Sequence, residues 1–205
     1  MLNRNLSPMR MFSEYAAKFR PRYSFKGSDK KYFDKWKAEA LPEVLSCLGE
    51  FPPKANSLNP ELSAEWEHDG LIKQRWFLDV AERISAVLQV NRPQKLQKGE
   101  KYPAILCAMG TANMEKKTVM GNDSTDSLKA DIKQFNYSYG HKMAKAGFVT
   151  YAMDWIGFGE RNDNKKPNFK NNDRGRDWCN LYYLHSTMLG MTSLSINVTH
   201  GKAAK

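Results

Sequence analysis

The feature that most constrains the fold is the order of apolar and polar segments between residues 102 and 161. Residues 104–109 form an apolar run that is too short for a helix and is closed by a glycine, so they predict a buried strand. Residues 135–147 carry apolar side chains three to four positions apart, which predicts a helix with one face against a sheet. Residues 148–154 predict a second strand. A helix between two strands favours a right-handed crossover, so the segment predicts a parallel βαβ unit.

Upstream segments predict an antiparallel start to the same sheet. Residues 70–80 and 84–90 are rich in apolar, aromatic and β-branched side chains, and a short polar corner joins them, as expected for a pair of strands. Residues 115–133 are polar and predict an irregular loop. The sequence therefore predicts an α/β domain over residues 61–205.

The first part of the chain has a different pattern. Helical spacing occurs around residues 9–19 and 31–48, and a proline-containing stretch follows them. Proline interrupts a helix and restricts the residue before it. We therefore expect residues 1–60 to form a helical extension and an extended connector, separate from the sheet.

A resemblance to a known family is carried by four segments. These are PAILCAMG at 103–110, YGHKMAKAGFVTYAMDWIGFGER at 139–161, LHSTMLGMTSLSINVTHGKAAK at 184–205 and, less specifically, GLIKQRWFLDV at 70–80. They resemble the α/β-hydrolase superfamily, most closely its acetyl-xylan-esterase and dienelactone-hydrolase-like branch. The resemblance implies a partial α/β-hydrolase fold with an N-terminal helical extension.

The resemblance also implies a serine carboxylic-ester hydrolase, with an acetylated carbohydrate as one candidate substrate, that needs no metal and no organic cofactor. Such enzymes carry their serine in a G-x-S-x-G turn, followed along the chain by an acid and a histidine. These 205 residues contain no such turn. The family pattern would place it beyond Lys205, so we assign no catalytic residue here. We expect this chain to be the N-terminal portion of the enzyme, and to be inactive alone.

One part of the catalytic machinery is expected within the chain. In this superfamily a backbone N–H from the loop after the first crossover strand helps to form the oxyanion hole. The resemblance places this role at Gly110 and Thr111, although Met109 stands where the family usually has a histidine. The alternative is that Gly110 only ends the strand.

The net charge of +10 raises the question of nucleic-acid binding. Basic and aromatic side chains are concentrated in the first forty residues, but no nucleic-acid-binding motif accompanies them. A solvated amphipathic helix explains this pattern better, so we expect no nucleic-acid partner. The alternative function is a noncatalytic binding or scaffold module that uses this basic segment. Binding that weakens steeply with salt would distinguish it.

Cysteine usage and hydropathy bear on the compartment. Three widely spaced cysteines predict no disulfide framework and suit a reducing environment. No stretch has the length and apolarity of a membrane helix or of a secretory signal. We therefore expect a cytoplasmic protein with no membrane partner.

Charged residues after the second crossover strand lie where α/β folds bind ligands. We predict that Asp154 and Arg161 instead fix the local turn by hydrogen bonds.

Two histidines late in the chain are not candidates for the catalytic base. His185 and His200 precede the expected serine, so the order of the triad excludes them. The strand at 104–109 would lack its next neighbour in this chain, and its open edge predicts self-association.

Overall fold

The computed structural model describes residues 5–96, 99–110, 115–163 and 178–205. The chain divides into two compact units, Met1–Cys47 and Leu48–Lys205. The first unit contains helices α1 (Pro8–Lys18) and α2 (Lys30–Ser46), which confirms the two predicted N-terminal helices. Each begins at a polar cap: the Ser7 hydroxyl accepts from the backbone N–H of Arg10, and the Asp29 carboxylate accepts from that of Tyr32.

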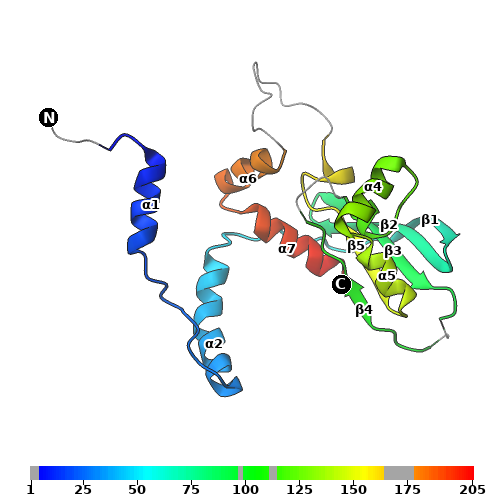
Figure 1. Ribbon diagram of the computed structural model, residues 1–205, viewed down its shortest axis with the longest axis horizontal. Helices are drawn as coiled ribbons and strands as arrows, with labels where there is room; N and C mark the ends of the chain where they lie inside the picture. Colours follow the sequence, from blue (N-terminus) through cyan, green and yellow to red (C-terminus); the bar gives the residue numbers. More distant parts are fainter. Residues whose placement is uncertain (1–4, 97–98, 111–114, 164–177) are drawn as a thin grey trace, which may run out of the picture. The chain divides into compact units, whose positions relative to one another are not determined.

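The second unit is built on a five-stranded sheet (Figure 1). The strands are β1 (Glu61–His68), β2 (Leu71–Ala81), β3 (Ile84–Pro93), β4 (Ala104–Leu106) and β5 (Val149–Met153). Their order in the sheet is β1-β2-β3-β5-β4. Antiparallel pairing joins β1 to β2, β2 to β3 and β3 to β5, whereas β4 and β5 are parallel. This confirms the predicted antiparallel start and the parallel crossover unit.

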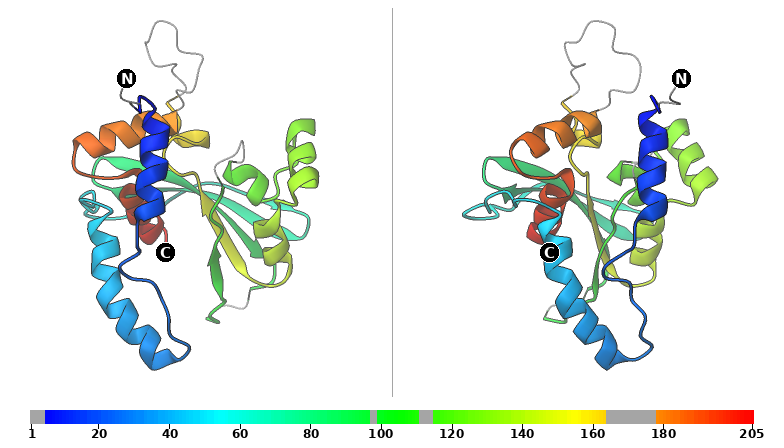
Figure 2. Two further views of the ribbon diagram at one scale, coloured as in Figure 1. Left: turned by 60° about the vertical axis from the view of Figure 1, so that its left-hand side comes forward. Right: turned by 90° about the vertical axis from the view of Figure 1, so that its left-hand side faces the viewer.

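Helices lie on both faces of this sheet (Figure 2). They are α3 (Lys116–Val119), α4 (Asp126–Phe135), α5 (Tyr139–Lys145), α6 (Trp178–Met188) and α7 (Ser193–Ala203), with a 3₁₀ turn at Gly159–Arg161. Within the described residues, none of the helices has both the length and the apolarity needed to cross a bilayer.

Two apolar clusters fill the space between the sheet and its helices. Successive side chains of a strand point to opposite faces, and the neighbours Ala152 and Met153 accordingly belong to different clusters. Met153 packs with residues of β2 and β3, and with Ala203 from α7. Ala152 packs with Val119 and with Met109 on the other face. The core therefore lies on both sides of β5.

Three predicted boundaries are wrong. The strand predicted over 104–109 ends at Leu106; the Cys107 N–H still donates to the Tyr151 carbonyl oxygen of β5 over 2.8 Å, and the side chains of Cys107 and Met109 are buried beside Ala152. The loop predicted over 115–133 contains α3 and most of α4. The helix predicted over 135–147 begins only at Tyr139, because Asn136 adopts a left-handed conformation that ends α4.

Strand β1 was not predicted. Its sequence alternates apolar Leu62, Ala64 and Trp66 with polar residues, as in a half-buried strand, and this signal was overlooked. In the structure all eight residues are exposed, and β1 is held by its pairing with β2.

Candidate functional site

The carboxyl ends of β4 and β5 lie side by side because the two strands are parallel (Figure 1). Ligands of α/β folds bind at this edge of the sheet. A hydrogen bond joins the two loops that leave it: the indole Nε1 of Trp155, after β5, donates to the carbonyl oxygen of Met109, after β4, over 3.2 Å. This hydrogen bond therefore joins the segments that directly follow β4 and β5.

Gly110 lies just beyond this hydrogen bond. It is exposed, and a Cβ added to it would meet no heavy atom within 4 Å. Thr111, the second residue predicted for the oxyanion hole, lies outside the described residues. The oxyanion role of the two residues stays a prediction.

A buried ion-pair network joins the start of α3 to the turn after β5. The Lys116 ammonium lies 2.5 Å from Asp154 Oδ2 and also contacts the Glu160 carboxylate. Only 3% of the Lys116 side chain and 1% of the Asp154 side chain are exposed. The backbone N–H of Lys116 donates to Asp154 Oδ1 over 2.9 Å. Because both charges are removed from water, each depends on the other for compensation.

Glu160 extends this network to the sheet. Its Oε1 accepts from Nη2 of Arg75, on β2, over 2.6 Å. Burial favours the neutral form of this carboxyl, but hydrogen bonds from Lys116 and Arg75 outweigh burial, so the pKa of Glu160 is lowered. The carboxylate is therefore charged at neutral pH and links β2, α3 and the turn after β5.

The same residues fix the turn after β5. Asp154 Oδ2 accepts from the backbone N–H of Glu160 over 3.1 Å, and Arg161 Nη1 donates to the Asp154 carbonyl oxygen over 3.3 Å. These bonds confirm the predicted turn-fixing role of Asp154 and Arg161. Gly159 has φ +49°, and a Cβ there would lie 2.4 Å from Asp154 Oδ2.

Replacing Gly159 should therefore loosen the turn. We expect Gly159→Ala to lower the free energy of unfolding by about 2 kcal/mol, from backbone strain together with displacement of the Asp154 carboxylate. Urea unfolding measures this change.

Gly190→Ala is the matched control. Gly190 also has a positive φ, of +74°, but its added Cβ would meet only Glu50 Cγ at 3.9 Å. It should cost about 1 kcal/mol, the backbone strain alone. Equal losses in the two variants would contradict a specific contact between Gly159 and Asp154.

Arg161 also binds His200 on α7. Its Nη2 lies 3.0 Å from His200 Nδ1, so the ring nitrogen accepts the bond and His200 is neutral. Burial, reinforced by the Arg161 charge, lowers the pKa of His200 to about 3. Burial also lowers the pKa of Arg161, to about 10, which still leaves the guanidinium charged.

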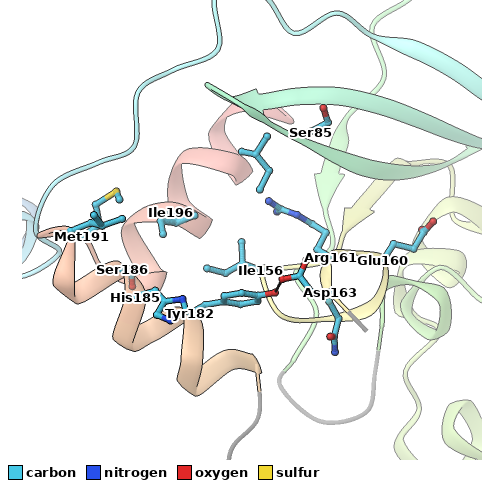
Figure 3. Close-up of a pocket in the computed structure, with 13 residues that line it drawn as sticks. Ser85, Ile156, Glu160, Arg161, Asp163, Tyr182, His185, Ser186, Met191 and Ile196 are labelled. Carbon is cyan, nitrogen blue, oxygen red and sulfur yellow. Dashed lines mark hydrogen bonds between the residues drawn. The ribbon is translucent and has the colours of Figure 1, made fainter. Parts of the chain in front are cut away.

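A pocket of about 460 Å³ opens beside this turn, between it, the tip of the β2–β3 hairpin, α6 and α7 (Figure 3). The Tyr182 hydroxyl donates to the Asp163 carboxylate at its rim (Figure 3). Burial and this hydrogen bond raise the pKa of Tyr182 to about 12. The lining residues are Ile84, Ser85, Ile156, Glu160, Arg161, Asn162, Asp163, Tyr182, His185, Ser186, Leu189, Met191 and Ile196.

The described side chains do not form a nucleophilic centre. Among the described residues, the histidines with side-chain hydrogen bonds pair with Asp69 and Arg161, not with a serine. No cluster of three or more His, Cys, Asp or Glu side chains in the described ranges could hold a metal ion. What the described edge provides is an ion-pair network that joins α3, the turn after β5 and β2.

Sequence reasoning missed Lys116, Glu160 and Arg75 as members of this network. Glu160 lies within the quoted segment at 139–161, next to Arg161, and its place in the turn could have drawn attention to it. Nothing in the sequence identifies its partners, because Arg75 and Lys116 lie 85 and 44 positions away along the chain.

These features define an α/β protein with the N-terminal strand arrangement of a hydrolase sheet. A model described as an abhydrolase family matches residues 2–198, and the chain therefore belongs to this family of α/β hydrolases. No curated protein matches the sequence.

Solved structures are similar to the chain. One, from Bacteroides fragilis NCTC 9343 and assigned as an acetyl xylan esterase, aligns with a TM-score of 0.73 and 20% identity over 98% of this chain and 50% of its own. The chain thus spans about half the length of that protein. A methylesterase aligns more weakly, with a TM-score of 0.42 and 19% identity over 74% of this chain and 29% of its own. At these identities the first likeness bears on the fold alone.

Proposed function

We propose that this chain is the N-terminal portion of a serine carboxylic-ester hydrolase. The observation that carries the proposal is the parallel β4–β5 pair, with β4 at the end of the sheet and the loop containing Gly110 at its carboxyl end. Family membership supports the same assignment. In α/β hydrolases this arrangement leaves one side of β4 open for the strand that carries the serine.

The contribution of this chain to catalysis would be electrostatic. Backbone N–H groups of Gly110 and Thr111 would stabilise the negative charge that develops on the ester oxygen when the serine attacks. The Lys116–Asp154–Glu160 network would hold the loop that carries them, since Lys116 follows it directly along the chain. The serine, acid and histidine would come from residues beyond Lys205, so the isolated chain would be inactive.

The substrate we propose is an acetyl ester of a carbohydrate. The name of the similar Bacteroides fragilis protein supports this class.

We further propose a cytoplasmic location, because Cys47, Cys107 and Cys179 are all free thiols. The open edge of β4 would favour self-association of the isolated chain.

Hydrolysis of p-nitrophenyl acetate tests the function. We expect the complete protein that contains this chain to hydrolyse it with saturation kinetics, and the 205-residue chain to stay at the uncatalysed rate. Replacing the serine of the expected G-x-S-x-G turn by alanine is the control for the complete protein, and should abolish the activity.

Two outcomes would contradict the proposal. Saturable hydrolysis by the 205-residue chain would show that a nucleophile lies within it. A complete protein that hydrolyses neither this ester nor acetylated sugars would refute the hydrolase function.

A further inference from the structure

A polar groove crosses the sheet on the face that carries α3. Two adjoining pockets of about 280 and 200 Å³ form it, and they share Trp66, Gln89 and Asn122. Trp66 on β1 and Gln89 on β3 belong to the floor, and the turn after α3 contributes Asn122. The groove ends at Lys116 and Glu160, which belong to the ion-pair network between α3 and the turn after β5.

Two features of this floor are not explained by the fold. The Trp66 side chain lies on an edge strand and is 40% exposed. Gln89 is only 7% exposed, yet its side-chain amide makes no hydrogen bond within the described part of the chain and faces both pockets. The amide nitrogen and oxygen of Gln89 are not among the buried unpaired atoms of the described residues, so they reach the space of the groove and can bond a ligand or water there.

The cations of the groove are already paired, which argues against an anionic ligand. Arg75 binds Glu160, Lys116 binds Asp154 and Glu160, and the Lys117 ammonium lies 3.4 Å from Glu115 Oε2. The Lys73 ammonium donates to the carbonyl oxygens of Met120 and Gly121 over 3.0 and 3.2 Å. A phosphate or sulfate would have to displace these bonds.

We propose that this groove binds a neutral sugar ring of an oligosaccharide. The ring would stack its apolar face on the Trp66 indole, which offers a large rigid surface at low entropic cost. The Gln89 amide, which both donates and accepts, would bond adjacent hydroxyls, and Asn122 would add a further amide at the wall. The groove would then seat a sugar unit next to the one that carries the ester.

This assignment rests on the proposed function in one respect: that the bound sugar is part of the ester substrate. Binding of the sugar itself does not depend on it. The groove meets the ion-pair network between α3 and the turn after β5 at Lys116 and Glu160. A chain of sugars that lies in the groove would therefore lead toward the ester-binding edge of the sheet.

The test is binding of an unacetylated xylo-oligosaccharide, which has no ester to hydrolyse, to the complete protein by isothermal titration calorimetry. We expect saturable binding that weakens at least tenfold in Trp66→Ala and in Gln89→Leu. The matched controls are Trp178→Ala on α6 and Gln94→Leu, an exposed residue just after β3, which should bind like wild type. Thermal unfolding of each variant establishes that it is folded.

Each alternative outcome overturns a specific part of the proposal. No saturable binding to wild type, or equal affinity in Trp66→Ala and Gln89→Leu, refutes the sugar site even if p-nitrophenyl acetate is hydrolysed. Tighter binding of an acidic oligogalacturonide or of a nucleotide refutes the neutral ligand. Sugar binding that depends on Trp66, without any ester hydrolysis, supports the groove and refutes the hydrolase function.

Discussion

Lys116→Met should lower the free energy of unfolding by about 3–5 kcal/mol, the usual loss when one partner of a buried ion pair is removed. Methionine keeps most of the apolar stem of the side chain but leaves the Asp154 carboxylate without its ammonium, in a position where only 1% of it is exposed. Two backbone N–H groups would still donate to this carboxylate, from residues 116 and 160. Urea unfolding followed by tryptophan fluorescence measures the loss.

Lys117→Met is the matched control. The Lys117 side chain is 44% exposed and pairs only with Glu115, at 3.4 Å, so its loss should change the free energy by less than about 1 kcal/mol. The double variant Lys116→Met/Asp154→Asn removes both charges and should recover at least about 1 kcal/mol relative to Lys116→Met. A Lys116→Met variant as stable as Lys117→Met would show that the buried pair contributes nothing.

The sequence was sufficient for the fold wherever an apolar pattern coincides with a buried element. Strands β2, β3 and β5 combine apolar and β-branched side chains with burial, and all three were predicted. By contrast, β1 and α4 were missed although both have a readable pattern: apolar residues alternate along β1, and Leu128, Ile132 and Phe135 share one face of α4. The polar residues around α4 obscured that face, and its cap was a further signal, since the Thr125 hydroxyl accepts from the backbone N–H of Leu128.

Only those contacts of the site that lie within a single turn of the chain were predictable from the sequence. Asp154 and Arg161 lie in one turn, and their spacing indicated the hydrogen bonds that the structure contains. Lys116 and Arg75 reach that turn from other elements, and a single sequence does not reveal such pairs. The apolar run at 104–109 was equally ambiguous, since burial in the sheet and burial beneath a helix require the same residue types.

Acid should destabilise the protein through His200. The folded state keeps this histidine neutral with a pKa of about 3, whereas an unfolded chain has a histidine pKa of about 6.5. Below pH 6.5 the unfolded state therefore binds a proton that the folded state does not bind, so stability falls with pH until about pH 3. The stabilisation is fully present above pH 6.5. We expect wild type to lose about 3 kcal/mol from this residue between pH 7 and pH 4.

His200→Gln separates this effect from acid titration of the carboxylates. Glutamine does not titrate, and its amide oxygen can accept the bond that His200 Nδ1 receives from Arg161. Urea unfolding at pH 7, 5.5 and 4 should therefore show a smaller loss of stability in this variant than in wild type. His185→Gln, at an exposed residue of α6, should behave like wild type. If wild type and His200→Gln lose stability in parallel as the pH falls, His200 is protonated without cost in the folded protein, and Arg161 does not depend on its neutral ring.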